Sequence, residues 1–464
     1  MRKEMLEKVH NARKNLIVSG DISVGKTKNV IIPLVKEMID NGESLVILDS
    51  KEEYLNTYYK SLKEKNYNIV ILNFRDLNRS EGWNPLEYPY TLFKNDNKDK
   101  AIDYLDKIGS TMFYEGKETD PFWASSASDF FTGVTLGLYD DGNDNQINLN
   151  SVNAMFNGVD KRYGGSDYLT KYFDLKDKTS SAYVYACGTC YAPRETKGGI
   201  LAVARQRLRT YTSREKLSIL LNKTTIDLNM ITEKPTAIFV IGKDEDKNIN
   251  IIPTMFIEQI FDILLDKNNN RPYNFVLDNF DSILNINHLS DMLSSGLSRM
   301  VKFIIGTRSI NDLKIHYGDY ISKLCNTIII NDREIEMNLD SERISEDNTF
   351  NDNKLLVENI DYPKLENKKI ELFDFNKYVV DNSLKNFYTE NPDLKVPIDN
   401  VNNPFGEVKN PDKVFPEFSV DELITRIDDK IAELDRMEEE DKKKREEANK
   451  KNEIKSELEQ FKIN

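Results

Sequence analysis

The sequence predicts an α/β fold in which the alternation of strands and helices is interrupted by a long helical stretch. Short apolar runs typical of buried strands occur at residues 15–19, 44–49 and 68–73, and helical patterns separate them. From about 96 to 232 the pattern is helical with polar loops, and an apolar strand run returns at 236–241. Strands that alternate with helices predict parallel β-α-β units. We therefore expect a layered α/β domain with an all-helical domain inserted into it.

The expected elements follow from their individual patterns. Residues 28–40 have apolar side chains at helical spacing, with Pro33 early in the helix and Asn41-Gly42 as its stop. Residues 54–66 also have a helical pattern. In the inserted stretch we expect helices at 99–113, 123–139, 194–213 and 214–222. After it we expect helices at 251–266 and 287–296, and strands at 273–278, 301–306 and 326–331.

The C-terminal part predicts a linker followed by one helix. Five prolines in 391–418 indicate a linker. A stripe of apolar residues at helical spacing follows it: Val420, Leu423, Ile427, Ile431, Leu434 and Met437. Residues 438–453 are almost wholly charged, as in a solvated helix or a disordered segment. The stripe is short, so both packing on the chain's own body and a coiled coil with a partner stay open. The expected segments are the α/β domain in two parts (1–95 and 233–390), the insert (96–232), the linker (391–418) and the C-terminal helix (419–464).

Composition limits the classes of function. A net charge of −14 argues against a protein that coats nucleic acid with its whole surface, although a locally basic channel remains compatible with it. No apolar run is long enough to span a bilayer. The polar N-terminus is expected to lead straight into the first strand and has no signal peptide pattern. We therefore expect a cytoplasmic protein. Of the three cysteines, Cys187 and Cys190 form a CxxC pair, but the histidines are scattered, so we interpret the pair as coincidental and not as a zinc site.

The strongest motif is a phosphate-binding loop. Gly20-Asp-Ile-Ser-Val-Gly25-Lys26-Thr27 matches GxxxxGK[ST] and lies between an expected strand and an expected helix. The glycines, with Ser23 between them, let backbone N–H groups turn toward phosphate oxygens, and the helix start adds its positive dipole end. Lys26 is expected to reach the β- and γ-phosphates, and the Thr27 hydroxyl to coordinate Mg²⁺. The sequence thus predicts binding of ATP with Mg²⁺.

A second acidic strand end should help to hold the metal. Asp49 follows the strand at 44–48, and Asp278 follows the strand at 273–277. In P-loop proteins an Asp in such a position holds Mg²⁺. From the residues alone both remain candidates, since either can simply end a strand.

Several segments together resemble the TraG/TraD-type coupling proteins of type IV secretion and conjugation, in the form of Gram-positive conjugative elements. The loop and its helix (15–35) are similar to the start of the family, and 49–53 (DSKEE) to its Asp-Pro-Lys-Gly-Glu. Residues 71–88 end in Trp-Asn-Pro-Leu-Glu-Tyr, 120–123 are Asp-Pro-Phe-Trp, and 418–434 resemble the family's tail. The resemblance covers about 15 to 440 and favours Asp278 as the metal ligand.

The resemblance implies a RecA-like motor domain with an inserted all-helical domain, assembled as a hexamer. Such rings couple ATP hydrolysis to the movement of single-stranded DNA, with its bound relaxase, into a channel of type IV secretion proteins at the membrane. The family normally has N-terminal membrane helices, whereas this chain has only about 15 residues before its first expected strand. The resemblance is therefore to a form without them, peripheral at the cytoplasmic face of the plasma membrane, or to one whose helices are on a separate protein.

Three positions bear on catalysis by resemblance. The family has a catalytic Glu after its acidic strand, where this chain has Asn279, and an amide cannot take a proton from water at neutral pH. Arg308 stands where the family has a Gln that senses the γ-phosphate, and Arg299 where it has an arginine that can reach a neighbouring subunit's nucleotide. For both arginines an ordinary surface role remains open.

Two functions therefore stay open. One is a DNA-translocating ATPase, and the other is a nucleotide-binding scaffold or adaptor of the same machinery that does not hydrolyse ATP. An unrelated P-loop enzyme such as a kinase lacks a supporting second motif. Arg205 and Arg209 lie four residues apart on one face of an expected helix and are candidates for contact with DNA phosphates, although a solvated helix face is the commoner explanation of such a pair.

Overall fold

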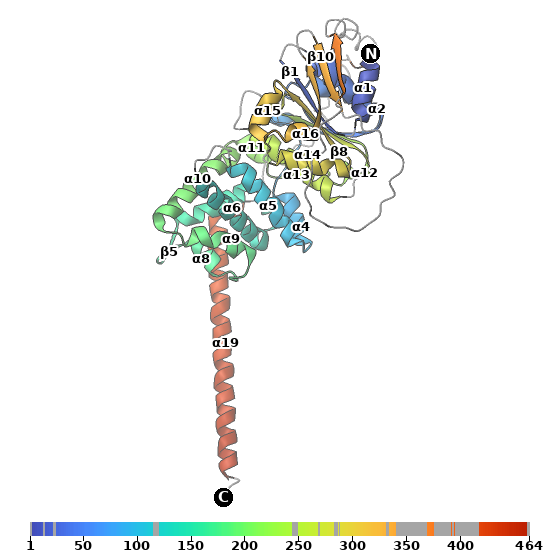
Figure 1. Cartoon of the computed structure of the whole chain (residues 1–464). Coiled ribbons are helices and arrows are strands. Elements are labelled where there is room, and N and C mark those ends of the chain that lie inside the picture. The colour runs from blue at the N-terminus through green and yellow to red at the C-terminus, as the bar shows by residue number, and fades with distance from the viewer. Residues whose placement is uncertain are drawn as a thin grey trace, which may run out of the picture. The chain divides into compact units, whose positions relative to one another are not determined.

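The computed structural model divides into two compact units. One comprises residues 1–83 and 224–411, and the other comprises 84–223 and 412–464. Figure 1 shows the α/β unit and the helical unit, each of which is described by itself below. The structure describes residues 2–12, 14–21, 25–114, 120–243, 249–267, 270–282, 286, 288–330, 334–339, 369–374, 391, 394 and 417–461.

A nine-stranded sheet forms the centre of the α/β unit. Its order is β11-β10-β9-β1-β8-β7-β2-β6-β3. The seven strands from β9 to β3 are parallel to one another, and β10 pairs antiparallel with both of its neighbours, β9 and β11. The strands are β1 Asn15–Gly20, β2 Ser44–Leu48, β3 Asn68–Asn73, β6 Thr236–Ile241, β7 Tyr273–Leu277, β8 Val301–Thr307, β9 Cys325–Ile330, β10 Glu334–Leu339 and β11 Lys369–Asp374. The predicted α/β fold with a parallel sheet is confirmed.

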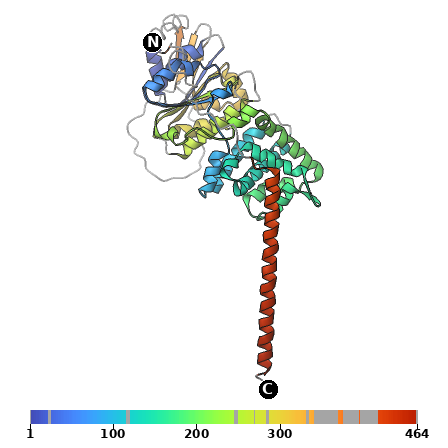
Figure 2. The ribbon, with the colours of Figure 1, turned by 180° about the vertical axis from the view of Figure 1, so that it is seen from behind.

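Helices cover both faces of this sheet (Figures 1 and 2). On one face α1 Arg2–Asn11, α2 Ile32–Asp40 and α3 Glu53–Glu64 share one apolar cluster with alternate residues of the strands. On the other face Phe261 of α13 packs on Phe275 and Phe303. The other helices among the described residues of this unit are α12 Met230–Glu233, α13 Ile251–Asp266, α14 Leu289–Gly296, α15 Ile310–Tyr317 and α16 Ile321–Leu324.

Two local features of this unit differ from the sequence pattern. The polar N-terminus was expected to lead straight into β1, but it contains α1, which buries Leu6 and Val9. The helix after the phosphate loop begins with a π-helical turn, η2 Thr27–Ile31, before α2. Pro33 therefore lies just after the π turn, at the start of the regular helix, where its missing N–H is least disruptive.

The second unit is built from helices around an aromatic core. Phe130 of α6 packs edge to face on Phe156 of α7, with their ring centroids 5.0 Å apart. The helices are α4 Glu87–Lys94, α5 Lys98–Phe113, α6 Phe122–Asp141, α7 Leu149–Phe156, α8 Tyr168–Asp174, α9 Ser181–Cys190, α10 Arg194–Thr212, α11 Glu215–Leu220 and α19 Val420–Phe461. A short hairpin, β4 Arg162–Tyr163 and β5 Ser166–Asp167, precedes α8.

The boundaries of this unit differ from those expected at 96 and 232. Tyr88 of α4 packs on Tyr104 of α5, with their ring centroids 5.1 Å apart, so the helix before residue 96 belongs with the insert. The chain passes between the units at Trp83/Asn84 and Lys223/Thr224. The C-terminal helix, expected as a segment of its own, belongs to the same helical unit.

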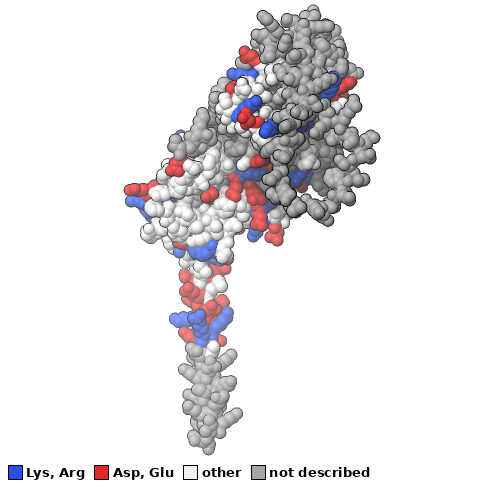
Figure 3. Space-filling model, in the orientation of Figure 1, with Lys and Arg blue, Asp and Glu red and all other residues white. Residues whose placement is uncertain are grey.

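The first turns of α19 dock on their own unit. Leu423 and Ile427 are buried, and the backbone N–H of Phe418 donates to Ser151 Oγ over 2.9 Å. Farther along, Leu434 and Met437 are 39% and 57% exposed. Acidic and then basic side chains follow on the projecting helix (Figure 3). The start of the apolar stripe therefore packs on the chain's own body.

Most of the linker at 391–418 lies outside the described residues. Within the described residues, no helix combines the length and the apolarity that a membrane span requires.

Candidate nucleotide site

The phosphate loop leaves the carboxyl end of β1, at the edge where parallel α/β sheets bind ligands. Gly20 ends the strand, and the helix begins after Gly25; Ser23, expected to contribute to the loop, lies outside the described residues. Gly25 has a φ of +78°, which favours glycine. A Cβ added there would lie 2.6 Å from Asn29 Nδ2, so the Asn29 side chain would have to move.

Lys26 is folded back along this loop. Its side chain is 3% exposed, and its Nζ lies 3.4 Å from the carbonyl oxygen of Gly20. An ammonium group held against the loop's own backbone is close to where phosphate oxygens are bound in a GxxxxGK[ST] loop. The fold thus keeps the Lys26 side chain buried beside Gly20, where the loop begins.

The side chains of Thr27 and Asp278 are in contact, although β8 lies between the strands that precede them. The Thr27 hydroxyl donates to Asp278 Oδ2 over 2.6 Å, although 251 residues separate the two in sequence. β8 lies between β1 and β7, so the loop after β1 and the residue after β7 emerge at the same edge of the sheet. The structure therefore brings together the two predicted metal-binding residues.

Asp278 is held by three donors. Its Oδ2 also accepts the Tyr54 hydroxyl over 2.7 Å, and its Oδ1 accepts the backbone N–H of Asn279 over 2.9 Å. A Cβ added to Gly306 on β8 would lie 2.3 Å from Asp278 Oδ1, so the glycine leaves room for the carboxylate. The carboxylate is 3% exposed and has one orientation fixed by its neighbours.

Asp49, the other open candidate, caps a helix instead. Its Oδ2 accepts the backbone N–H of Leu55 over 2.8 Å, in the first turn of α3. Burial raises the pKa of the Asp49 carboxyl to about 7, while the backbone donors of the first turn oppose that rise. The preference for Asp278 over Asp49 therefore agrees with the geometry, because Asp278 is the one that touches Thr27.

Asn279 sits in a left-handed turn. Its φ is +59°, and asparagine adopts this region more readily than most side chains. Its half-buried side chain follows Asp278 at the carboxyl edge of the sheet. The turn gives a physical reason for Asn here that is independent of catalysis.

The two arginines lie at opposite edges of the sheet. Arg308 follows the carboxyl end of β8, on the edge of the phosphate loop, with an exposed side chain and its backbone N–H donating to Asp281 Oδ2 over 2.7 Å. Thr307 Oγ1 donates to the other oxygen of Asp281 over 2.7 Å, so this carboxylate ties the ends of β7 and β8 together. Arg299 is exposed before the start of β8, at the opposite edge, and the structure does not bring it to this loop.

The basic face of α10 is partly neutralised. Arg205 pairs with Asp160, N to O over 2.9 Å, and donates to the carbonyl oxygen of Phe156. Arg209 is exposed. An arginine that is already paired with a carboxylate of its own unit attracts DNA phosphates less strongly.

The CxxC pair lies on one helix, α9. Burial raises the pKa of Cys190 to about 12, as expected of an inert structural thiol. Among the described residues no group of His, Cys, Asp and Glu has the arrangement of a metal site.

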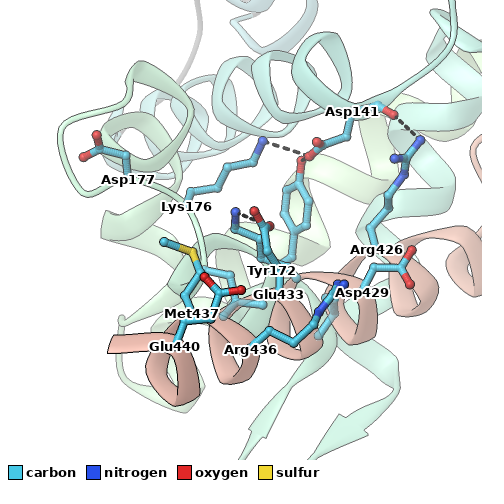
Figure 4. Close-up of a pocket in the computed structure, with 13 residues that line it drawn as sticks. Asp141, Tyr172, Lys176, Asp177, Arg426, Asp429, Glu433, Arg436, Met437 and Glu440 are labelled. Carbon is cyan, nitrogen blue, oxygen red and sulfur yellow. Dashed lines mark hydrogen bonds and ion pairs between the residues drawn. The ribbon is translucent and has the colours of Figure 1, made fainter. Parts of the chain in front are cut away.

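A cavity of about 930 Å³ lies elsewhere, within the helical unit (Figure 4). α6, α8 and α19 line it with charges of both signs that pair with one another, such as Lys176 with Asp141 and Lys430 with Glu433. Arg426 of α19 donates to the carbonyl oxygen of Asp141. This bond joins α19 to α6, whereas the Lys430–Glu433 pair lies within α19, and the phosphate loop belongs to the other unit.

Tyr54 is the site residue that sequence reasoning missed. It is one of six buried residues on α3, where an aromatic side chain at helical spacing indicates core packing. Its proximity to the segment 49–53 was the only available signal.

Comparison with solved structures gives distant likenesses. The bacterial conjugative coupling protein TrwBdeltaN70 is 14% identical, with a TM-score of 0.48 over 71% of this chain and 75% of that chain. The plasmid coupling protein TrwB in complex with ADP and Mg²⁺ is 15% identical, with a TM-score of 0.48 over 69% and 71%. VirB4 of Thermoanaerobacter pseudethanolicus is 10% identical, with a TM-score of 0.42 over 68% and 77%.

The family itself is shown by sequence. No curated protein matches the chain. A family model described as type IV secretory system conjugative DNA transfer matches residues 11–347, which is most of the chain. The chain therefore belongs to the type IV secretory system conjugative DNA transfer family, the coupling-protein family that its motifs resemble.

Proposed function

We propose that this chain binds ATP with Mg²⁺ on the loop 20–27 and acts as a coupling protein in conjugative DNA transfer. The observation that carries the proposal is the 2.6 Å hydrogen bond between Thr27 Oγ1 and Asp278 Oδ2, beside the buried Lys26. Family membership supplies the setting, a type IV secretion channel. In this proposal the chain assembles as a hexameric ring at the mouth of the channel, on the cytoplasmic face of the membrane.

The residues present suit a magnesium-bound triphosphate. A hydroxyl has one proton, and the Thr27 hydroxyl uses it in the hydrogen bond to Asp278. The lone pairs of Thr27 Oγ1 therefore remain for a cation. Carboxylate and hydroxyl oxygens are the ligand types that Mg²⁺ prefers. Lys26 would pair with the β- and γ-phosphates, and the first N–H groups of the helix would face the phosphate oxygens. When bound, Mg²⁺ would neutralise charge on those phosphates.

Hydrolysis depends on a position where the chain has an amide. Asn279 cannot accept the proton of an attacking water, and loss of a general base costs on the order of 10²–10⁴ in rate. This observation favours a second candidate function, a nucleotide-binding scaffold or adaptor in the same machinery. In either role the proposal assigns a phosphate contact to Arg308, which follows the carboxyl end of β8, and assigns Arg299 to a neighbouring subunit's nucleotide.

The proposal includes contact with single-stranded DNA and its relaxase, and family membership supports it. Arg205 and Arg209 remain the proposed phosphate contacts on α10. Because Arg205 is paired with Asp160, Arg209 should contribute more of the attraction.

ATP turnover with and without single-stranded DNA separates the two functions. A translocating ATPase should release phosphate faster when DNA is added, and Lys26→Ala should abolish that release. Binding of ATP without any turnover would identify the scaffold. A wild-type chain that binds no ATP in the presence of Mg²⁺ would refute both.

A further inference from the structure

Tyr54 is a buried hydroxyl donor with an unusual acceptor. It lies in the first turn of α3, is 2% exposed, and donates to Asp278 Oδ2 over 2.7 Å. The same oxygen accepts the Thr27 hydroxyl over 2.6 Å. Two hydroxyl groups from different elements thus converge on one carboxylate oxygen at the predicted metal site.

We propose that Tyr54 is a positioning residue for magnesium, which holds the Asp278 carboxylate so that Thr27 presents its lone pairs to the cation. The proposal rests on the proposed function, since it requires Mg²⁺ to bind with the nucleotide. It assigns a role to a residue outside the phosphate loop and outside the acidic strand. Tyr54 itself does not touch the metal or the nucleotide.

The hydrogen-bond directions at this oxygen follow from the groups involved. The Tyr54 hydroxyl is a phenol O–H and donates its proton in the hydrogen bond to Asp278 Oδ2. An ionised carboxylate accepts only. Thr27 must therefore donate its single proton to Asp278, and its lone pairs face away from that bond. Rotation of the carboxylate would release this arrangement.

The backbone position of Tyr54 is itself fixed by the Asp49 carboxylate. Asp49 accepts backbone N–H groups of the first turn of α3, including that of Leu55 over 2.8 Å. A capped first turn leaves the Tyr54 backbone little freedom. The segment 49–53, which resembles a family motif, thus places the helix that supplies the third group at Asp278.

The Asp278 carboxylate is then nearly saturated by protein donors. Of about four lone-pair sites, two on Oδ2 accept Tyr54 and Thr27, and one on Oδ1 accepts the backbone of Asn279. One site on Oδ1 remains for the metal or for one of its waters. Without the Tyr54 hydroxyl, Oδ2 loses one of its two donors, and the carboxylate is held less firmly by the Thr27 hydroxyl and the Asn279 N–H alone.

Tyr54→Phe removes the donor and keeps the ring. The matched control is Tyr58→Phe, which removes another buried hydroxyl one turn along α3, where Tyr58 donates to the carbonyl oxygen of Ile32. We would measure ATP affinity of the full chain with Mg²⁺ and with EDTA, and titrate Mg²⁺ at fixed ATP. Partners that orient metal ligands typically contribute about 10- to 100-fold in metal affinity.

Tyr54→Phe should raise the Mg²⁺ concentration needed for half-saturation by about 10-fold or more, while ATP affinity in EDTA stays at the wild-type value. Tyr58→Phe should leave both unchanged. An unchanged Mg²⁺ titration in Tyr54→Phe would overturn the inference, and so would an equal loss with and without Mg²⁺, which indicates a purely structural role. A wild-type chain without ATP binding would refute the proposed function, and this inference with it.

Discussion

Replacing Asn279 by glutamate tests whether the missing base is what limits hydrolysis. The substitution restores a carboxylate where members of the family carry one, and a general base is worth on the order of 10²–10⁴ in rate. We therefore expect Asn279→Glu to raise ATP turnover by about that factor over the wild-type chain. The rest of the site keeps Lys26 beside Gly20 and Thr27 in contact with Asp278.

The backbone conformation at Asn279 predicts that Asn279→Glu also lowers the free energy of unfolding. Asn279 has a φ of +59°, and a left-handed conformation costs roughly 1–2 kcal/mol for side chains other than Gly, Asn and Asp. Asn279→Glu should therefore lose about 1 kcal/mol of unfolding free energy. Asn279→Asp, which suits the same turn, should keep the wild-type stability.

The two variants also differ in reach. The aspartate carboxylate is shorter by one carbon–carbon bond, about 1.5 Å, and misplacement by about 1 Å can cost 10²-fold in rate. Phosphate release and urea unfolding, measured on both variants and on wild type, separate the effects. Turnover in Asn279→Glu that stays at the wild-type level, in a folded protein that still binds ATP, would show that the amide is not the limiting residue.

Three further perturbations test other parts of the structure. Gly25→Ala should destabilise the α/β unit by about 1–2 kcal/mol in urea and weaken ATP binding, because φ is +78° and the space for a Cβ is filled; wild-type values for both would contradict the loop geometry. The hydrogen bond to Glu43 raises the pKa of His10, so its stabilisation is complete below the unfolded value near 6.5 and is lost as pH rises through the folded value. The loss of unfolding free energy in His10→Ala should therefore be larger at pH 6 than at pH 8.5, and equal losses would refute the ion pair. Ile427→Ala should cost about 2–4 kcal/mol and Met437→Ala less than about 0.5, since Ile427 is buried and Met437 is 57% exposed; equal costs in urea unfolding would contradict the docking of α19.

Much of the fold could be predicted because the strands are uninterrupted apolar runs. β6 at Thr236–Ile241 and α13 at Ile251–Asp266 have the predicted bounds, since each is a long segment with one clear pattern. α1 was missed because its few apolar residues, such as Leu6 and Val9, are too sparse to give a period. The strand order depends on tertiary packing, which no local pattern encodes.

The candidate site was predictable only where a motif fixes it. Lys26 and Thr27 belong to one loop with a fixed spacing, so their roles follow from sequence. The residues alone left Asp49 and Asp278 open, because both end apolar strands. The family resemblance favoured Asp278, and in the structure Asp278 is the one that contacts Thr27. Tyr54 and the left-handed turn at Asn279 depend on contacts and dihedral angles that no sequence pattern announces.

The most direct test of the central claim is ATP binding measured by calorimetry in the presence of Mg²⁺, on wild type and Lys26→Ala. A buried ammonium that contacts phosphate contributes about 1.5–3 kcal/mol, or roughly 10- to 150-fold in affinity. We predict saturable binding to the wild-type chain and an affinity lower by that factor in the variant. Equal affinities for the two proteins, or no binding to the wild-type chain, would contradict the assignment of the loop 20–27 as a nucleotide site.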